Sequence, residues 1–117
     1  MTESARIKKR QRKVRRTVAA GDASARAVAE RLRLTRLGLA RARKISDLPQ
    51  AEFYRLAGIS SQAGNNYEQG ARRIQLDQAI KLCDAHRLTL DWIYRNEPSG
   101  LPYDIQVAIA DLRAKAR

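Results

Sequence analysis

Residues 50–70, QAEFYRLAGISSQAGNNYEQG, constrain the fold more than any other part of the chain, because they predict two short helices joined at a glycine. The first helix carries Phe53 within an apolar pattern of helical period. Gly58 follows, and glycine tolerates the positive φ that a tight turn between helices requires. The second helix can begin after Ser60, whose hydroxyl can accept from the free N–H groups of the first turn. It ends near Gly70.

Four segments, in this order and spacing, resemble the Cro/C1 (XRE) family of bacterial and phage repressors: Gln50-Ala51-Glu52, Ala57-Gly58-Ile59-Ser60, Tyr67-Glu68-Gln69-Gly70 and Leu88-Thr89-Leu90-Asp91-Trp92-Ile93. The similarity covers about residues 39–94. The resemblance implies an all-α, lambda-repressor-like helix-turn-helix domain of about five helices, to which this chain adds a basic N-terminal extension and a C-terminal helix. It also implies a transcriptional regulator, most often a repressor, that binds double-stranded DNA as a homodimer.

The charge of the chain is concentrated before this motif. Residues 1–46 hold 15 Lys and Arg against 3 Asp and Glu, whereas residues 47–117 hold 9 of each. Such an excess indicates a polyanionic partner. A membrane surface is the competing interpretation, but residues 6–16 contain only Ile7 and Val14 as apolar anchors. With no long apolar run and no signal-peptide core after the basic start, we expect no membrane partner and a cytoplasmic, nucleoid-associated protein.

The pattern divides the chain into three parts. Residues 1–21 are a basic arm, residues 22–97 are the helix-turn-helix domain with an extended first helix, and residues 98–117 are a linker and a C-terminal helix. Within the domain, helices are predicted at about 23–45, with Asp22 as a candidate N-cap, then after Pro49, at 76–86 and at 92–94. The C-terminal helix is predicted at 103–116.

The resemblance places the DNA-reading side chains at the start of the second motif helix and one turn later. The residues expected to read bases are Ser60, Ser61, Gln62, Asn65 and Asn66. Their amides and hydroxyls suit base edges, although the same residues could merely solvate a surface helix. The residues expected to contact phosphates are Gln50, Gln69, Arg72 and Arg73 from the motif and Lys8, Lys9, Arg10, Arg12 and Lys13 from the arm.

Two structural pairs follow from the same resemblance. Glu68 matches a family position that pairs with an arginine of the first helix, and counting back from Gln50 without gaps makes that partner Arg43. Arg41 or Lys44 could substitute, or Glu68 could lack a fixed partner. Tyr54 stands where the family usually has a small residue, and Gly64 where it usually has an aliphatic one. The large side chain is therefore expected to fill the space above the glycine.

The remaining residues indicate no catalytic chemistry. One cysteine and one histidine cannot form a zinc site, and no phosphate-binding or nucleophile motif is present, so we expect no enzyme, no metal, no cofactor and no small-molecule ligand. Cys83 continues an apolar stripe with Leu76, Ala79 and Ile80 and is expected in the core. His86 lies near the end of its helix, where a surface or capping role is expected.

The C-terminal helix carries a stripe that has two possible uses. Ile105, Ala108, Ile109 and Leu112 could form the dimer contact, or they could fold back onto the domain's own core. Two other functions also remain open at this point. One is an architectural DNA-binding protein in which the basic arm dominates, and the other is an antitoxin-type autorepressor that holds a partner protein through residues 103–116.

Overall fold

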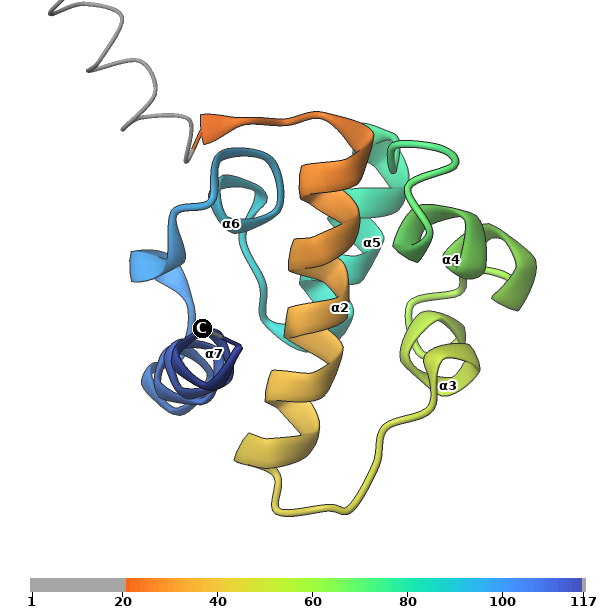
Figure 1. The fold of residues 1–117 in the computed structure, drawn as a ribbon. Helices are drawn as coiled ribbons and strands as arrows, with labels where there is room; N and C mark the ends of the chain where they lie inside the picture. Colours follow the sequence, from red (N-terminus) through yellow and green to blue (C-terminus); the bar gives the residue numbers. More distant parts are fainter. Residues whose placement is uncertain (1–20, 117) are drawn as a thin grey trace, which may run out of the picture.

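The computed structural model describes residues 21–116, which form six α-helices and one 3-10 turn. Their bounds are α2 Ala25–Ala42, α3 Gln50–Arg55, α4 Ser61–Glu68, α5 Leu76–His86, α6 Leu90–Arg95, η2 Pro98–Gly100 and α7 Tyr103–Lys115. The all-α class predicted from the sequence is confirmed, whereas the basic arm lies outside the described residues. In Figure 1, α2 runs through the middle of the fold, with α3 and α4 on one side and α6 and α7 on the other.

The first helix of the domain is shorter than expected at both ends. Ser24, not Asp22, is its N-cap, because the Ser24 hydroxyl accepts from the Ala27 N–H at 3.2 Å. The Asp22 carboxylate instead accepts from the Ser24 N–H at 2.8 Å, so it holds the capping residue in place. The helix ends at Ala42, and Lys44 adopts a φ of 57°, which turns the chain away from the helix axis.

The centre of the core joins α2 to α6 through a polar contact. Trp92 is fully buried and its indole N–H donates to the Thr35 hydroxyl at 2.7 Å. The Thr35 hydroxyl in turn donates to the Arg31 carbonyl at 2.6 Å. A buried polar group without a partner is costly, so this chain of bonds allows an indole and a hydroxyl to lie among apolar side chains.

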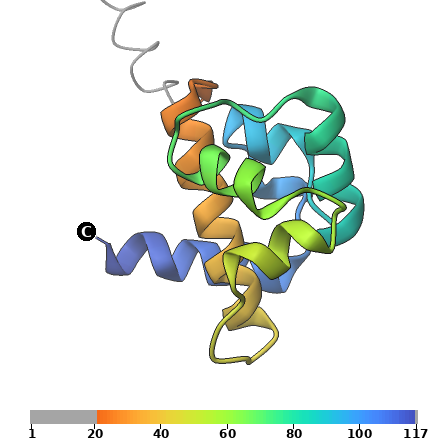
Figure 2. The same cartoon turned by 90° about the vertical axis from the view of Figure 1, so that its right-hand side faces the viewer.

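The apolar stripe of α7 packs on α2 of the same chain. Ile105, Ala108 and Ile109 are buried, and a Cβ built at Gly38 of α2 would lie 3.1 Å from Cγ1 of Ile109. The glycine thus permits the close approach of the two helices, which Figure 2 shows crossing. Of the two uses that the sequence left open for the stripe, these three side chains follow the second and belong to the domain's own core, while Leu112 is half-buried.

Helix α5 has the predicted bounds but a different buried face. Ala79, Leu82 and His86 point inward, while Leu76 and Ile80 are exposed and Cys83 is half-buried. Burial raises the pKa of the Cys83 thiol to about 11. The expectation of a surface histidine is wrong. The His86 ring stacks on Phe53 with centroids 4.4 Å apart, and its Nε2 lies 2.8 Å from the Phe53 carbonyl oxygen, because the ring fills the gap between α3 and α5.

Candidate nucleic-acid interface

The turn between α3 and α4 fixes the direction of α4. Gly58 adopts a φ of 75°, which lets the Ile59 N–H donate back to the Tyr54 carbonyl at 2.9 Å. Ile59 is buried and anchors the turn in the core. The Ser60 hydroxyl then accepts from the Ala63 N–H at 3.2 Å and caps α4, as the sequence predicts. The short helix therefore leaves the turn at a defined angle.

The contact between Tyr54 and Gly64 sets how closely α4 packs on α3. Tyr54 is fully buried, and a Cβ built at Gly64 would lie 2.3 Å from its Cδ2 atom. No side chain larger than hydrogen fits there while the ring keeps its place. The phenol ring also meets Phe53 edge-on, with centroids 4.9 Å apart, so it has little freedom to move. The sequence-predicted exchange therefore corresponds to a real contact between the two motif helices.

The predicted base-reading side chains lie together at the surface of α4. Ser60, Ser61, Gln62 and Asn65 are exposed, and Asn66 is half-buried at the edge of this surface. We call these five residues the amide face. Beside it lies a hollow of about 200 Å³ bounded by Gln62, Asn66 and Arg72 among others. The Ser60 hydroxyl caps α4, but the Ser61 hydroxyl and the amides of Gln62, Asn65 and Asn66 have no structural task, and such groups are the chemistry that base edges require.

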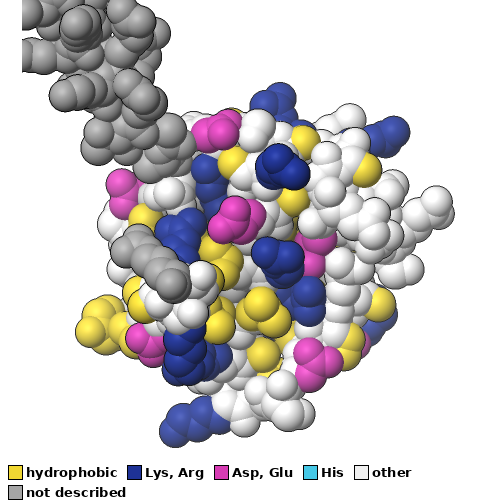
Figure 3. Space-filling view, in the orientation of Figure 1, with side chains coloured by type: hydrophobic (Ala, Val, Ile, Leu, Met, Phe, Trp, Pro, Cys, Tyr) yellow, Lys and Arg dark blue, Asp and Glu magenta, His cyan; other side chains and the backbone are white. Residues whose placement is uncertain are grey.

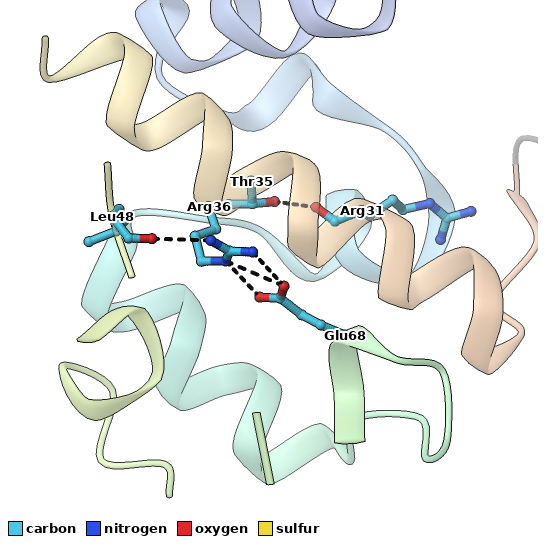
Figure 4. A network of polar contacts seen from close by, with 5 residues as sticks. All are labelled: Arg31, Thr35, Arg36, Leu48 and Glu68. Atoms are coloured by element: carbon cyan, nitrogen blue, oxygen red, sulfur yellow. Dashed lines mark hydrogen bonds and ion pairs between the residues drawn. The ribbon is translucent and has the colours of Figure 1, made fainter. Parts of the chain in front are cut away.

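The expected partner of Glu68 is wrong: the carboxylate pairs with Arg36, not with Arg43. Arg36 Nη2 lies 3.0 Å from Glu68 Oε1, and its Nε lies 3.1 Å from Oε2 (Figure 4). Arg36 Nη1 also donates to the Leu48 carbonyl at 3.2 Å. The hydrogen bonds from Glu68 raise the pKa of the Arg36 guanidinium. The pair joins α2, the loop before α3 and α4, and it neutralises a carboxylate beside the amide face.

The ungapped count failed because the connection between α2 and α3 is longer than the count assumed. Arg36 precedes Arg43 by seven residues, which is about two turns of helix, so the two positions share one face of a helix. The chain, however, leaves the helix after Ala42 and spans residues 43–49 before α3 begins. Arg43 and Lys44 therefore lie in an exposed connection, while Arg41 pairs with Asp111 of α7 at 3.5 Å. Allowing seven additional residues in the connection between α2 and α3 moves the expected partner of Glu68 from Arg43 to Arg36.

The described phosphate candidates differ in exposure and in position. Gln50 is half-buried at the first residue of α3, and Gln69 is exposed at the end of α4. Arg72 and Arg73 are exposed in the loop after α4, and Arg73 Nη1 donates to the Ala23 carbonyl at 3.0 Å. This bond places the start of the domain, and hence the point where the arm joins it, beside that loop. The arm candidates lie outside the described residues.

A glycine turn between two short helices, the second with a polar exposed face, defines a helix-turn-helix DNA-binding fold. Residues 39–93 match the model of the Helix-turn-helix family, and this part of the chain is a domain of the Cro/C1 (XRE) type. Such domains belong to DNA-binding regulators. No curated protein and no solved structure matches the chain. Within residues 21–116, no helix is long and apolar enough to cross a membrane.

Proposed function

We propose that this protein is a sequence-specific transcriptional regulator that reads bases in the major groove with α4. The single observation that carries the proposal is the amide face, because the side chains of Gln62 and Asn65 are exposed and their amide groups form no hydrogen bond with another described residue. An Asn or Gln amide can donate and accept at N6 and N7 of adenine as a bidentate pair, and a serine hydroxyl can bond to several base edges. The side chains are therefore available for base recognition.

The position of α4 suits this task. The major groove is about 12 Å wide and an α-helix with its side chains measures about 10–12 Å across, so one helix fills the groove. Three contacts fix the orientation of α4, namely its Ser60 cap, the Tyr54–Gly64 contact and the Arg36–Glu68 pair. A helix held in this way can present its amides to bases without a large loss of conformational freedom.

We further propose that the protein acts as a repressor and binds a two-fold operator as a homodimer, as the family resemblance implies. The arm, with eight Lys and Arg in residues 6–16, supplies phosphate contacts that do not depend on sequence. Because the inner stripe of α7 is buried in its own protomer, the dimer contact uses another surface. We propose no catalytic role.

Selection of bound duplexes from random DNA tests the proposal. We expect an enriched sequence with two-fold symmetry and half-sites about one helical turn apart, since two copies of α4 have to enter successive turns of the major groove. The selected duplex should bind at least about a thousandfold more tightly than random duplex at physiological salt. Enrichment of no sequence, with tight salt-dependent binding to all duplexes, would instead identify an architectural protein.

A further inference from the structure

A second hollow, on the other side of α4 from Arg72, carries two arginines that no function described above uses. It measures about 440 Å³ and lies between the first half of α2 and the end of α4. Arg26 and Arg33 border it from α2, and Gln69 and Gly70 border it from the end of α4. Gly70 has a φ of 76°, and a Cβ built there would lie 3.5 Å from the Arg26 Cα, so the two segments are close.

The charges around this hollow favour an anion. Arg26 and Arg33 are exposed, and neither guanidinium group forms an ion pair or a hydrogen bond with another residue in the described part of the chain. Two carboxylates also border the hollow. Glu68 is already bound by the Arg36 guanidinium, so Glu30 is the one whose charge remains to oppose the two arginines. Figure 3 shows basic side chains along this side of the molecule, with acidic ones among them.

The two hollows lie on opposite sides of α4, and the hollow of Arg72 adjoins the edge of the amide face. Successive residues of a helix are about 100° apart around its axis, so Asn66 and Glu68 point to nearly opposite sides of α4. Asn66 borders the hollow of Arg72, and Glu68 borders the hollow of Arg26 and Arg33. Ser61, Asn65 and Gln69 lie between them on the exposed side. Arginines therefore stand on both sides of the surface that faces the bases.

This arrangement matches the shape of a major groove, whose two walls are the phosphates of the two strands. A helix that fills the groove brings groups on either side of it against opposite walls. Arg26 and Arg33 are seven residues apart, about 10.5 Å along α2, so their long side chains can reach different phosphates of one strand. Each contact of this kind releases condensed counterions and makes binding depend on salt.

We propose that Arg26 and Arg33 of α2 bind phosphates of one DNA strand while Arg72 contacts the opposite strand. The inference rests on the proposed insertion of α4 into the major groove and adds the first helix of the domain to the DNA-binding surface. Its effect is on affinity and orientation rather than on the choice of sequence, because phosphate contacts carry no direct base information.

The test compares the wild-type protein with the full-length double variant Arg26→Gln/Arg33→Gln in fluorescence-anisotropy titrations across a salt series. The probes are the duplex selected by the wild type and a random duplex. We expect the slope of log K against log salt to become less steep by about 1.8, or about 0.9 per lost contact. Affinity for both duplexes should fall by a similar factor, so their ratio is retained. The charge-conserving variant Arg26→Lys/Arg33→Lys should keep the wild-type slope.

Arg95→Gln is the matched control, since Arg95 is exposed on α6, on the far side of α2 from α4 (Figure 1). It should leave the slope unchanged. If the wild type binds duplex DNA and the double Gln variant keeps the wild-type slope, α2 does not contact phosphates and this inference is wrong, while the proposed function stands. If the wild type binds no duplex DNA, both fail. Thermal unfolding of the variants should match the wild type, because both side chains are exposed.

Discussion

The replacement Gly64→Val tests the contact that positions α4 against α3. The Cβ alone would lie 2.3 Å from Cδ2 and 2.5 Å from Cγ of Tyr54, and the ring is fully buried, so either the ring or the helix has to move. Such overpacking typically costs about 1–3 kcal/mol. Valine is a better helix former than glycine by a few tenths of a kcal/mol, which offsets little of this cost.

We therefore expect Gly64→Val to lower the free energy of unfolding by about 1–3 kcal/mol, or Tm by roughly 5–20 °C for a domain of this size. Tyr54→Ala should cost about 3–5 kcal/mol, because it leaves a hole where a buried aromatic ring lay. In the double variant the valine occupies part of that hole, so the combined loss should be smaller than the sum by about 0.5–3 kcal/mol.

The assay is urea or thermal unfolding followed by circular dichroism, with all four proteins in the same buffer. Asn65→Val is the control, because it introduces the same side chain one residue further along α4 at an exposed position. It should change stability by no more than about 0.5 kcal/mol. Additive losses in the double variant would refute the reasoning, since they would mean that Tyr54 and Gly64 do not share the space assigned to them.

Three further outcomes follow from the structure. Arg36→Met should lower the free energy of unfolding by about 2–4 kcal/mol, because it leaves the Glu68 carboxylate, which is 4% exposed, without its partner. The loss should be smaller than for a fully buried pair, since the Arg36 side chain is 15% exposed. Arg43→Met should have little effect, and equal losses in the two variants would contradict the pairing. Burial lowers the pKa of His86, so stability should be full above pH 6.5 and fall below it by up to about 1.4 kcal/mol per pH unit, as the unfolded chain takes up the proton first. Urea titrations at several pH values measure this, and since His86 is the only histidine, a flat profile between pH 7 and 5.5 would contradict its burial. Ile109→Ala should cost about 2–4 kcal/mol without changing the sedimentation mass, whereas a loss of mass at unchanged stability would make the α7 stripe an interface.

Local signals in the sequence predicted the motif well. The turn at Gly58, the Ser60 cap and the bounds of α5 each depend on a short stretch of chain. In such a stretch a single residue type, or the helical period of the apolar residues, is enough to predict the local structure. The Tyr54–Gly64 contact could also be predicted, because an exchange of large for small at two positions has a simple steric meaning. These features depend on neighbours within about ten residues.

The errors arose where distant parts of the chain meet. The partner of Glu68 depends on the length of the connection 43–49, and helical period alone cannot distinguish Arg36 from a residue two turns later. His86 looks like a surface residue until Phe53 is known to lie against it. The apolar stripe of α7 would suit a partner protein or the domain's own core equally well. It packs on its own core because Gly38 of α2 has no side chain and so lets Ile109 approach.

The central claim is that the amide face of α4 reads bases, and the most direct measurement is the ratio of affinities for the selected and random duplexes. Gln62→Ala and Asn66→Ala should each cost about 1–3 kcal/mol on the selected duplex and little on random duplex, so the ratio falls and discrimination relaxes at one base position. Gln75→Ala, at an exposed glutamine outside α4, should leave the ratio unchanged. If both α4 variants keep the wild-type ratio, α4 does not read the sequence.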